Sequence, residues 1–269
     1  MEKAQKLFDP IWEDYLKQNP HVKKIYELFT DLGERVVNDH IAFRTYNDPR
    51  INIDVLAQQF IEAGYEFKGE YQFEQKKLYA KHFELAGFKD APRIFISELK
   101  LEEMSPFLRK TVNALIDQIP TNLLNSPELI FKGRVWEKPS YSIYEKLRQE
   151  SEYASWLYVF GFRANHFTVN INALKQLDTM DKVIGFLKSN GFKMNTSGGE
   201  IKGSPESLLE QSSIIAGTIP IEFIEGIYNV PSCYYEFAKR YKDKNGDIYG
   251  GFIAKSADKI FESTDYRKN

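Results

Sequence analysis

Apolar residues recur at helical spacing at the start of the chain. Residues 4–17 and 22–30 each place large apolar side chains three or four positions apart, on either side of Asn19-Pro20. That period is typical of amphipathic helices, and the proline favours a break between them. We therefore predict N-terminal helices within residues 4–30.

An alternating pattern of apolar and polar residues then occurs twice, which predicts two related strands. The first copy includes Asn38–Thr45 and the second includes Ala164–Ile171, and each carries a histidine near its start. A stretch with helical period follows each strand and ends at Gly64 or Gly191. A glycine just after the last apolar turn is a typical signal for the end of a helix.

Three further strand-like segments follow each helix, so each copy predicts a βαβββ unit. The segments are 65–73, 77–85 and 93–99 in the first copy, and 192–201, 209–224 and 228–240 in the second. The two units cover residues 36–100 and 162–241, with a helical insertion at 101–160, all within a single domain over residues 1–269. We expect an α+β fold in which the paired units form a cupped, barrel-like mixed sheet with additional helices.

Composition and charge narrow the classes of function. Lys and Arg number 36 against 38 Asp and Glu, and a net charge of -2 argues against a dedicated nucleic-acid-binding protein. No apolar run approaches the roughly 18 residues of a membrane span, and the charged N-terminus is unlike a signal peptide. A single cysteine, Cys233, excludes an intrachain disulfide framework and a cysteine-rich zinc site. We therefore expect a soluble, cytoplasmic protein that acts on a small molecule.

Two of the four histidines, His40 and His166, occupy equivalent positions in the repeat. Strand alternation places each on the more polar face of its strand, which should point into the cup while the apolar face packs on helices. Two imidazoles and one carboxylate are the donor set of a facial triad, which leaves room on a divalent metal for substrate and O2. The alternative is that both histidines are hydrogen-bonded structural residues.

Glu236, on the last strand of the second unit, is the leading candidate for the carboxylate. It lies five positions after a proline, and Glu98 lies six positions after a proline at the end of the first unit. We therefore expect Glu98 to be its counterpart, either as a fourth metal ligand or as a group beside the ligands. Glu222 and Glu225 rank lower because they lie near a predicted hairpin turn.

Arg44 lies four residues after His40 on the same face of the strand. A guanidinium there can hold a substrate carboxylate through two hydrogen bonds, or it can pair with a buried acid. Arg163 precedes the second strand and is the weaker candidate for this role. His82 lies in a lysine-rich strand and is expected to be exposed to solvent.

These segments resemble those of a known family. Asp39–Thr45, Arg93–Leu99 and Tyr234–Arg240 are similar to proteins grouped as domain of unknown function 1338, and the resemblance covers most of the chain. That family includes the 2-oxoadipate dioxygenase/decarboxylase of lysine catabolism in bacteria and plants. Its fold belongs to the vicinal-oxygen-chelate, or glyoxalase-like, group. This chain is shorter than the characterised enzymes and resembles a compact subgroup often described as hydrolases or glyoxalase-like proteins.

The resemblance implies a non-haem Fe(II) site held by His40, His166 and Glu236, with Arg44 binding a carboxylate of the substrate. The implied reaction converts a 2-oxo acid and O2 into a 2-hydroxy acid and CO2. The expected partners are therefore O2 and a 2-oxo acid similar to 2-oxoadipate, and neither nucleic acid nor a membrane is expected. The shorter chain leaves open the length of the acid.

Two other functions stay open from the residues alone. A metal-dependent hydrolase, lyase or isomerase of glyoxalase type would use Zn, Ni or Mn as a Lewis acid and would need no O2. A binding protein would close the coordination of its metal, with both Glu98 and Glu236 as ligands. Dependence on oxygen separates the first alternative from a dioxygenase. The residues do not indicate an oligomeric state.

Overall fold

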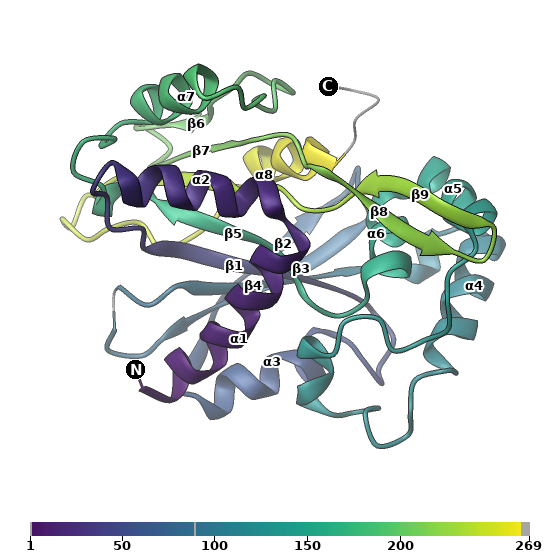
Figure 1. The fold of residues 1–269 in the computed structure, drawn as a ribbon. Helices are drawn as coiled ribbons and strands as arrows, with labels where there is room; N and C mark the ends of the chain where they lie inside the picture. The colour runs from purple at the N-terminus through teal and green to yellow at the C-terminus, as the bar shows by residue number, and fades with distance from the viewer. Residues whose placement is uncertain (1, 89, 265–269) are drawn as a thin grey trace.

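A curled sheet flanked by helices dominates the computed structural model, which describes residues 2–88 and 90–264 (Figure 1). The helices are α1 (Glu2–Gln18), α2 (Pro20–Asp31), α3 (Ile53–Glu62), α4 (Pro106–Ile116), α5 (Tyr141–Glu150), α6 (Glu152–Phe160), α7 (Met180–Ser189) and α8 (Ala254–Phe261). The strands are β1 (Asn38–Tyr46), β2 (Tyr65–Phe73), β3 (Leu78–Leu85), β4 (Arg93–Leu99), β5 (Ala164–Asn170), β6 (Lys202–Ser204), β7 (Leu209–Ser213), β8 (Thr218–Phe223), β9 (Gly226–Pro231) and β10 (Glu236–Arg240). Short 3-10 helices lie at Leu101–Glu103, Pro127–Phe131, Ile171–Ala173 and Glu262–Thr264.

The main sheet has eight strands in the order β2-β3-β4-β1-β5-β10-β7-β6. β1 and β5 lie antiparallel at its centre, and each has a parallel neighbour on its outer side, β4 beside β1 and β10 beside β5. The remaining pairs are antiparallel in both halves. The halves match as β1-α3-β2-β3-β4 and β5-α7-β6-β7-β10, which confirms the predicted α+β fold of paired βαβββ units.

The second unit differs from the strands predicted for it. Residues 192–201 contain only an isolated bridge, 209–224 divides into β7 and β8, and 228–240 divides into β9 and β10. β8 and β9 form a separate two-stranded hairpin outside the main sheet. Apolar and polar residues also alternate through this hairpin, so the pattern alone does not show which sheet a strand joins.

The break between α1 and α2 falls at the expected place. Asn19 is fully buried there, its side-chain amide donates to the carbonyl of Tyr15 at 2.8 Å, and its side-chain oxygen accepts from the N–H of Cys233 at 3.0 Å. The predicted N-terminal helices are therefore present, and the turn between them is bonded to the segment before β10. Residues 101–160 contain α4, α5 and α6 joined by turns.

One face of the sheet packs against helices through the apolar residues of its central strands. Phe43 of β1 contacts Phe60 of α3, with ring centroids 5.5 Å apart, and Phe167 of β5 lies 4.8 Å from Trp12 of α1. The residues that alternate with these point into the curl of the sheet. The predicted division into an apolar face toward helices and a polar face toward the interior is confirmed.

Helix α8, yellow in Figure 1, lies across the open side of the curl. It contacts β2 at one edge of the sheet and β6 and β7 at the other. Phe261 at its end packs edge-on against Phe73 of β2, with ring centroids 5.3 Å apart. The polar face of the central strands is therefore covered by α8.

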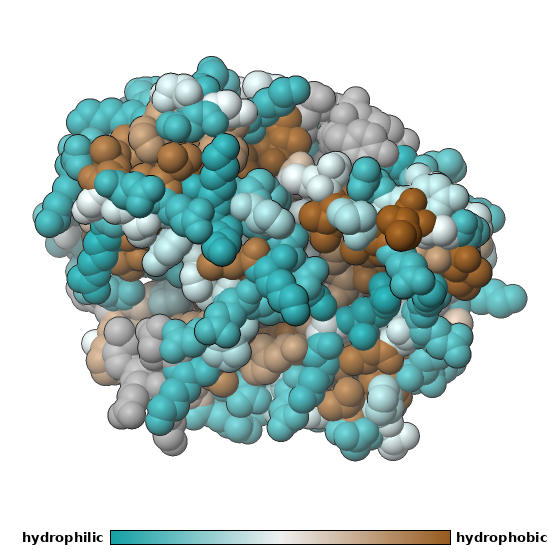
Figure 2. Space-filling model, viewed as in Figure 1, coloured by the Kyte–Doolittle hydropathy of each residue, from teal (hydrophilic) through white to brown (hydrophobic). Residues whose placement is uncertain are grey.

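The surface view shows mostly hydrophilic side chains, with apolar ones in several groups, one of them near the β8–β9 hairpin (Figure 2). Ile224 and Ile227 at that hairpin are 69% and 72% exposed. Within the described part of the chain, no helix has the length and apolar character needed to cross a bilayer.

Removal of the Phe167 ring tests the packing of the apolar face. Phe167 is fully buried, so we expect Phe167→Ala to lower the free energy of unfolding by about 3–5 kcal/mol through the cavity it leaves. Phe67→Ala is the control, because Phe67 is 52% exposed and its loss should cost less than about 1 kcal/mol. Urea denaturation measures both, and equal losses would contradict the assigned packing.

Candidate metal centre

Strand pairing brings His40, His166 and Glu236 together on the enclosed face of the sheet. His40 of β1 and Glu236 of β10 both lie opposite Thr168 of β5, one on each side of it. His166 precedes Thr168 by two residues, so its side chain points to the same face. Three strands from distant parts of the sequence thus place two imidazoles and a carboxylate at one point.

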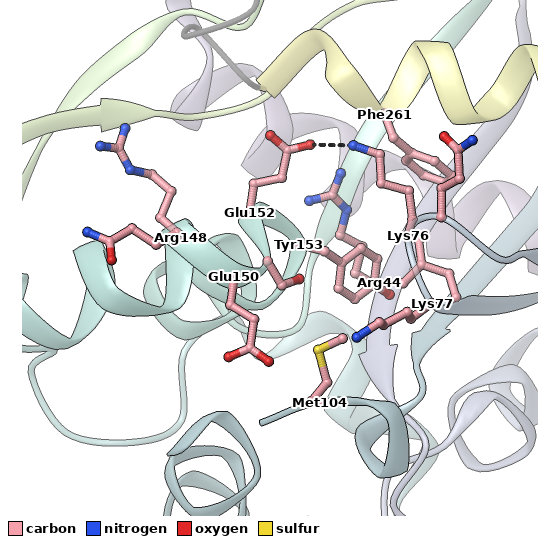
Figure 3. Close-up of a pocket in the computed structure, with 13 residues that line it drawn as sticks. Arg44, Lys76, Lys77, Met104, Arg148, Glu150, Glu152, Tyr153 and Phe261 are labelled. Atoms are coloured by element: carbon pink, nitrogen blue, oxygen red, sulfur yellow. Dashed lines mark hydrogen bonds and ion pairs between the residues drawn. The ribbon is translucent and has the colours of Figure 1, made fainter. Parts of the chain in front are cut away.

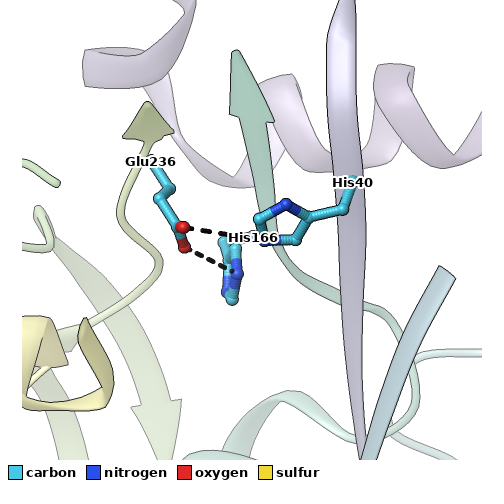
Figure 4. A group of neighbouring side chains, drawn as sticks. All are labelled: His40, His166 and Glu236. Atoms are coloured by element: carbon cyan, nitrogen blue, oxygen red, sulfur yellow. Dashed lines mark ion pairs between the residues drawn. The ribbon is translucent and has the colours of Figure 1, made fainter. Parts of the chain in front are cut away.

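The donor atoms of these three side chains converge (Figure 4). Nε2 of His166 lies 3.1 Å from Oε2 of Glu236, and Nε2 of His40 lies 3.6 Å from Oε1. All three donor atoms lie within 4.8 Å of one another, and each side chain is at most 5% exposed. Adjacent ligands of an octahedral first-row ion are about 3 Å apart when each lies ~2.1 Å from the metal. The group therefore fits a divalent metal bound by two histidines and one carboxylate.

The residue before each histidine orients its ring. Nδ1 of His40 donates to Oδ1 of Asp39 at 2.8 Å, and Nδ1 of His166 donates to Oδ1 of Asn165 at 3.1 Å. Both bonds turn Nε2 toward the site, where Nε2 of His40 also lies 3.0 Å from the hydroxyl of Thr168. Outer partners of this kind fix the tautomer and orientation of a metal-binding histidine. The sequence analysis missed both residues, although a polar residue before the histidine in each copy was a usable signal.

Two further buried side chains hold the acidic groups in place. Arg240 donates to both oxygens of Asp39, from Nε at 2.7 Å and from Nη2 at 2.9 Å. Gln211 of β7 donates to Oε1 of Glu236 at 2.7 Å. Burial on its own would raise the pKa of Asp39, but Arg240, His40 and Arg93 together outweigh it and lower that pKa well below its usual range. Asp39 is therefore ionised and able to accept from His40.

The charges of Glu236 and His166 suit metal binding. Burial opposes ionisation of Glu236, yet His40 and His166 lower its pKa to about 2. Burial lowers the pKa of His166 and outweighs the opposite effect of Glu236. For His40, burial is outweighed by Glu236 and Asp39, which raise its pKa. At neutral pH the carboxylate is ionised and His166 is neutral, which is the state that each needs as a ligand.

Arg44 lies further along β1, on the same face as His40, as predicted. Its side chain is only 3% exposed, and its Nε and Nη1 have no hydrogen-bond partner within the described structure. The guanidinium instead contacts the rings of Tyr153 and Trp156, at 4.8 and 5.2 Å from their centroids. It lines a cavity of about 470 Å³ (Figure 3). None of residues 2–88 and 90–264 gives Arg44 a buried acidic partner, so that alternative is wrong. A buried cation with free N–H groups is suited to bind an anion.

Glu98 lies outside the site, so the expectation that it is a fourth ligand or a neighbour of the ligands is wrong. Its carboxylate accepts from the N–H of Ile53, at the start of α3, at 3.0 Å. Glu98 lies opposite Thr45, the neighbour of Arg44, and strand alternation therefore turns it to the helix-covered face of the sheet. Glu98 therefore caps the start of α3, which packs on that face.

The sheet register shows which residue corresponds to Glu236 in the first unit. Glu236 lies opposite Thr168, two residues after the histidine of its unit. In the first unit the residue two after the histidine is Ala42, and Phe95 lies opposite it. The counterpart of Glu236 is therefore Phe95. Glu98 lies three positions after Phe95, and an odd number of positions reverses the face of a strand, so spacing from the proline did not identify the counterpart.

The lower-ranked carboxylates lie at the β8–β9 hairpin, away from the donor group. Glu222 is exposed and pairs with Lys138 at 2.6 Å. Glu225 accepts from the N–H groups of Tyr141 and Ser142, at 2.7 and 3.1 Å, and so caps the start of α5. Both therefore have structural partners on the surface.

The remaining candidates also have structural partners. Arg163 pairs with Asp14 of α1 at 3.3 Å and does not approach the donor group. His82 is buried rather than exposed to solvent, and its Nδ1 lies 2.9 Å from the hydroxyl of Tyr71. The neighbouring lysines made the strand look solvated, but β3 lies inside the sheet, between β2 and β4.

Comparison with known proteins identifies close relatives. The 2-oxoadipate dioxygenase/decarboxylase family matches residues 7–246. The chain is 36% identical, over 93% of its length and 75% of the relative, to the chloroplastic/amyloplastic 2-oxoadipate dioxygenase/decarboxylase of Oryza sativa subsp. japonica. A crystal structure of hydroxyglutarate synthase from Oryza sativa with 2-oxoadipate superposes with a TM-score of 0.90 at 33% identity, covering 100% of this chain and 95% of that chain.

Two further structures share this fold. A protein from Shewanella frigidimarina with a provisional hydrolase assignment superposes with a TM-score of 0.87 at 47% identity, covering 93% of this chain and 98% of that chain. A provisionally assigned glyoxalase superfamily protein from Ralstonia eutropha superposes with a TM-score of 0.77 at 20% identity, over 93% of this chain and 86% of that chain. At that identity the likeness concerns the fold alone, and it confirms the glyoxalase-like architecture.

Loss of the Glu236 charge tests the metal centre. We expect Glu236→Gln to abolish tight binding of one divalent ion per chain, because an amide replaces the only anionic donor of the group. Titration with Co(II), followed by its visible absorption, measures the effect. Glu222→Gln removes an exposed carboxylate as the control and should bind like the wild type. Wild-type affinity in Glu236→Gln would contradict the site.

Proposed function

Because the chain belongs to the 2-oxoadipate dioxygenase/decarboxylase family, we propose that it converts 2-oxoadipate and O2 into 2-hydroxyglutarate and CO2 at an Fe(II) centre. One observation carries this proposal. The metal-binding group and the unpaired guanidinium of Arg44 line two cavities that share Phe261 in their walls, and His40 and Arg44 share one face of β1. In a 2-oxo dicarboxylic acid, the 2-oxo end suits the metal-binding group and the far carboxylate suits Arg44.

The donor set supports iron as the metal. Two imidazoles and one carboxylate, with open positions, are typical of non-haem Fe(II) oxygenases. Fe(II) held by His40, His166 and Glu236 would supply adjacent binding positions for the 2-oxo acid and O2. Asp39 and Asn165 keep the two Nε2 atoms directed at the ion. The burial of His40, His166 and Glu236 also keeps competing water away from the centre.

Arg44 selects and orients the acid. Its guanidinium would pair with the carboxylate at the far end of the substrate, beyond the end that binds at the metal. Four residues of strand extend about 13 Å, so the two binding groups suit a six-carbon chain better than a three-carbon one. The rings of Tyr153 and Trp156 exclude water around the guanidinium, and this strengthens its attraction to a carboxylate.

The reaction balances without an external reductant. The bond between C1 and C2 breaks, and C1 leaves as CO2. C2 gains an oxygen and becomes the new carboxylate, while the C3–H bond becomes a C–O–H group. The acid is oxidised by four electrons in these two changes, and one O2 accepts all four. The atoms of 2-oxoadipate and O2 together equal those of 2-hydroxyglutarate and CO2.

Oxygen consumption tests this function directly. Anaerobically purified protein loaded with Fe(II) should take up O2 when 2-oxoadipate is added and release CO2 and 2-hydroxyglutarate in equal amounts. Protein loaded with Zn, Ni or Mn should not. Conversion of the substrate without O2 by any of these forms would overturn the proposal and favour a glyoxalase-type hydrolase, lyase or isomerase.

The role of Arg44 predicts a selective loss of substrate affinity. Arg44→Ala should raise the KM for 2-oxoadipate by about 100-fold, since charged hydrogen bonds of about 1.5–3 kcal/mol are lost. It should act on 2-oxohexanoate, which lacks the far carboxylate, as the wild type does, and it should still bind the metal. Arg50→Ala, which removes a partly exposed arginine paired with Asp48, is the control. A wild-type KM in Arg44→Ala would contradict the role.

A further inference from the structure

Phe261 separates two cavities that the proposed substrate must occupy together. It is the last residue of α8, and its side chain is 6% exposed. It lines the cavity of about 470 Å³ that contains Arg44, and it also lines a cavity of about 20 Å³ beside His40, His166 and Glu236. Figure 3 shows its ring close to Arg44 at one side of the larger cavity.

The smaller cavity cannot admit a 2-oxo acid without movement of its wall. A volume of about 20 Å³ is room for about one water molecule. Part of the wall belongs to the sheet, where Phe95, Gln211 and the three donor residues are held by strand pairing. The rest comes from the C-terminal segment, through Phe252, Ala257, Ile260 and Phe261. The wall that can yield is therefore this segment.

Both ends of the C-terminal segment are attached to the sheet, while the ring of Phe261 is held only by packing. Before α8, Nη1 of Arg240 donates to the carbonyls of Tyr249 and Gly251 at 2.9 and 2.7 Å. After it, the hydroxyl of Ser263 lies 2.7 Å from that of Ser213 of β7. The Phe261 ring itself contacts the ring of Phe73 and lies 5.9 Å from the Arg44 guanidinium. It can therefore change position while the ends of the segment stay bound.

We propose that Phe261 is a gate and a specificity-determining residue between the metal centre and Arg44. Its ring closes the passage between the two cavities, and it moves aside when a dicarboxylic 2-oxo acid bridges them. The space that the ring yields sets the length of acid that can bind. This inference rests on the proposed function, because it takes the two ends of the substrate to lie on either side of Phe261.

The test compares binding of a six-carbon and a seven-carbon substrate. Titration calorimetry measures the affinity of Co(II)-loaded protein for 2-oxoadipate and for 2-oxopimelate, without turnover. Phe261→Ala and the milder Phe261→Leu should shift the affinity ratio toward 2-oxopimelate by about tenfold or more, as expected for room for one added methylene. Ser256→Gly is the matched control, because Ser256 is about as buried in α8 as Phe261 and lines neither cavity. Its ratio should stay within about twofold of the wild type.

The outcomes distinguish failure of the proposed gate from failure of the proposed function. A wild-type ratio in both Phe261 variants, with 2-oxoadipate still bound, overturns the gate and leaves the function intact. An equal shift in Ser256→Gly also overturns it, because general loosening of α8 would then explain the change. If Phe261→Ala does not fold, Phe261→Leu decides alone. Wild-type protein that binds Co(II) but neither acid overturns both the function and the gate.

Discussion

The burial of the Glu236 carboxylate between two imidazoles is the interaction on which the rest of the structure depends. A buried carboxylate is costly unless charged or hydrogen-bonding groups surround it. Here His40, His166 and Gln211 supply those groups from three other strands. The helices cover the opposite face of the sheet, and α8 covers the open side. The curled sheet thus provides the one place in which these polar side chains are both buried and mutually satisfied.

The two halves of the fold contribute different chemistry to this place. Each βαβββ unit supplies one histidine at an equivalent position, but only the second supplies a carboxylate. Its counterpart in the first unit is Phe95, whose side chain offers no metal-binding atom. The first unit instead supplies Arg44, and the corresponding residue of the second unit, four after its histidine, is Asn170. The nearly symmetric backbone therefore holds an asymmetric site, with a group suited to bind a metal at one end and an unpaired guanidinium at the other.

Much of this site follows from the sequence because strand alternation is a simple rule. It placed His40, His166 and Arg44 on one polar face, and the structure agrees. Spacing from the preceding proline, by contrast, pointed to Glu98, which lies three positions after the true counterpart, Phe95, and so on the opposite face of β4. Only the sheet register shows which residue of the first unit corresponds to Glu236.

Other features depend on contacts between distant parts of the chain. The amphipathic pattern of α8 indicates a buried face, but it does not show that the helix lies over the metal centre. The partnership of Arg240 with Asp39 is equally hidden, because 201 positions separate the two residues. These contacts turn a group of polar residues into an enclosed centre.

The most direct test of the central claim is an anaerobic crystal structure of the iron-loaded protein with 2-oxoadipate. The account predicts one iron ion bound by His40, His166 and Glu236. The 2-oxo end of the acid should lie at the iron, and its far carboxylate should lie within hydrogen-bond distance of Arg44. Iron bound by other residues, or an acid that does not reach both groups, would contradict it.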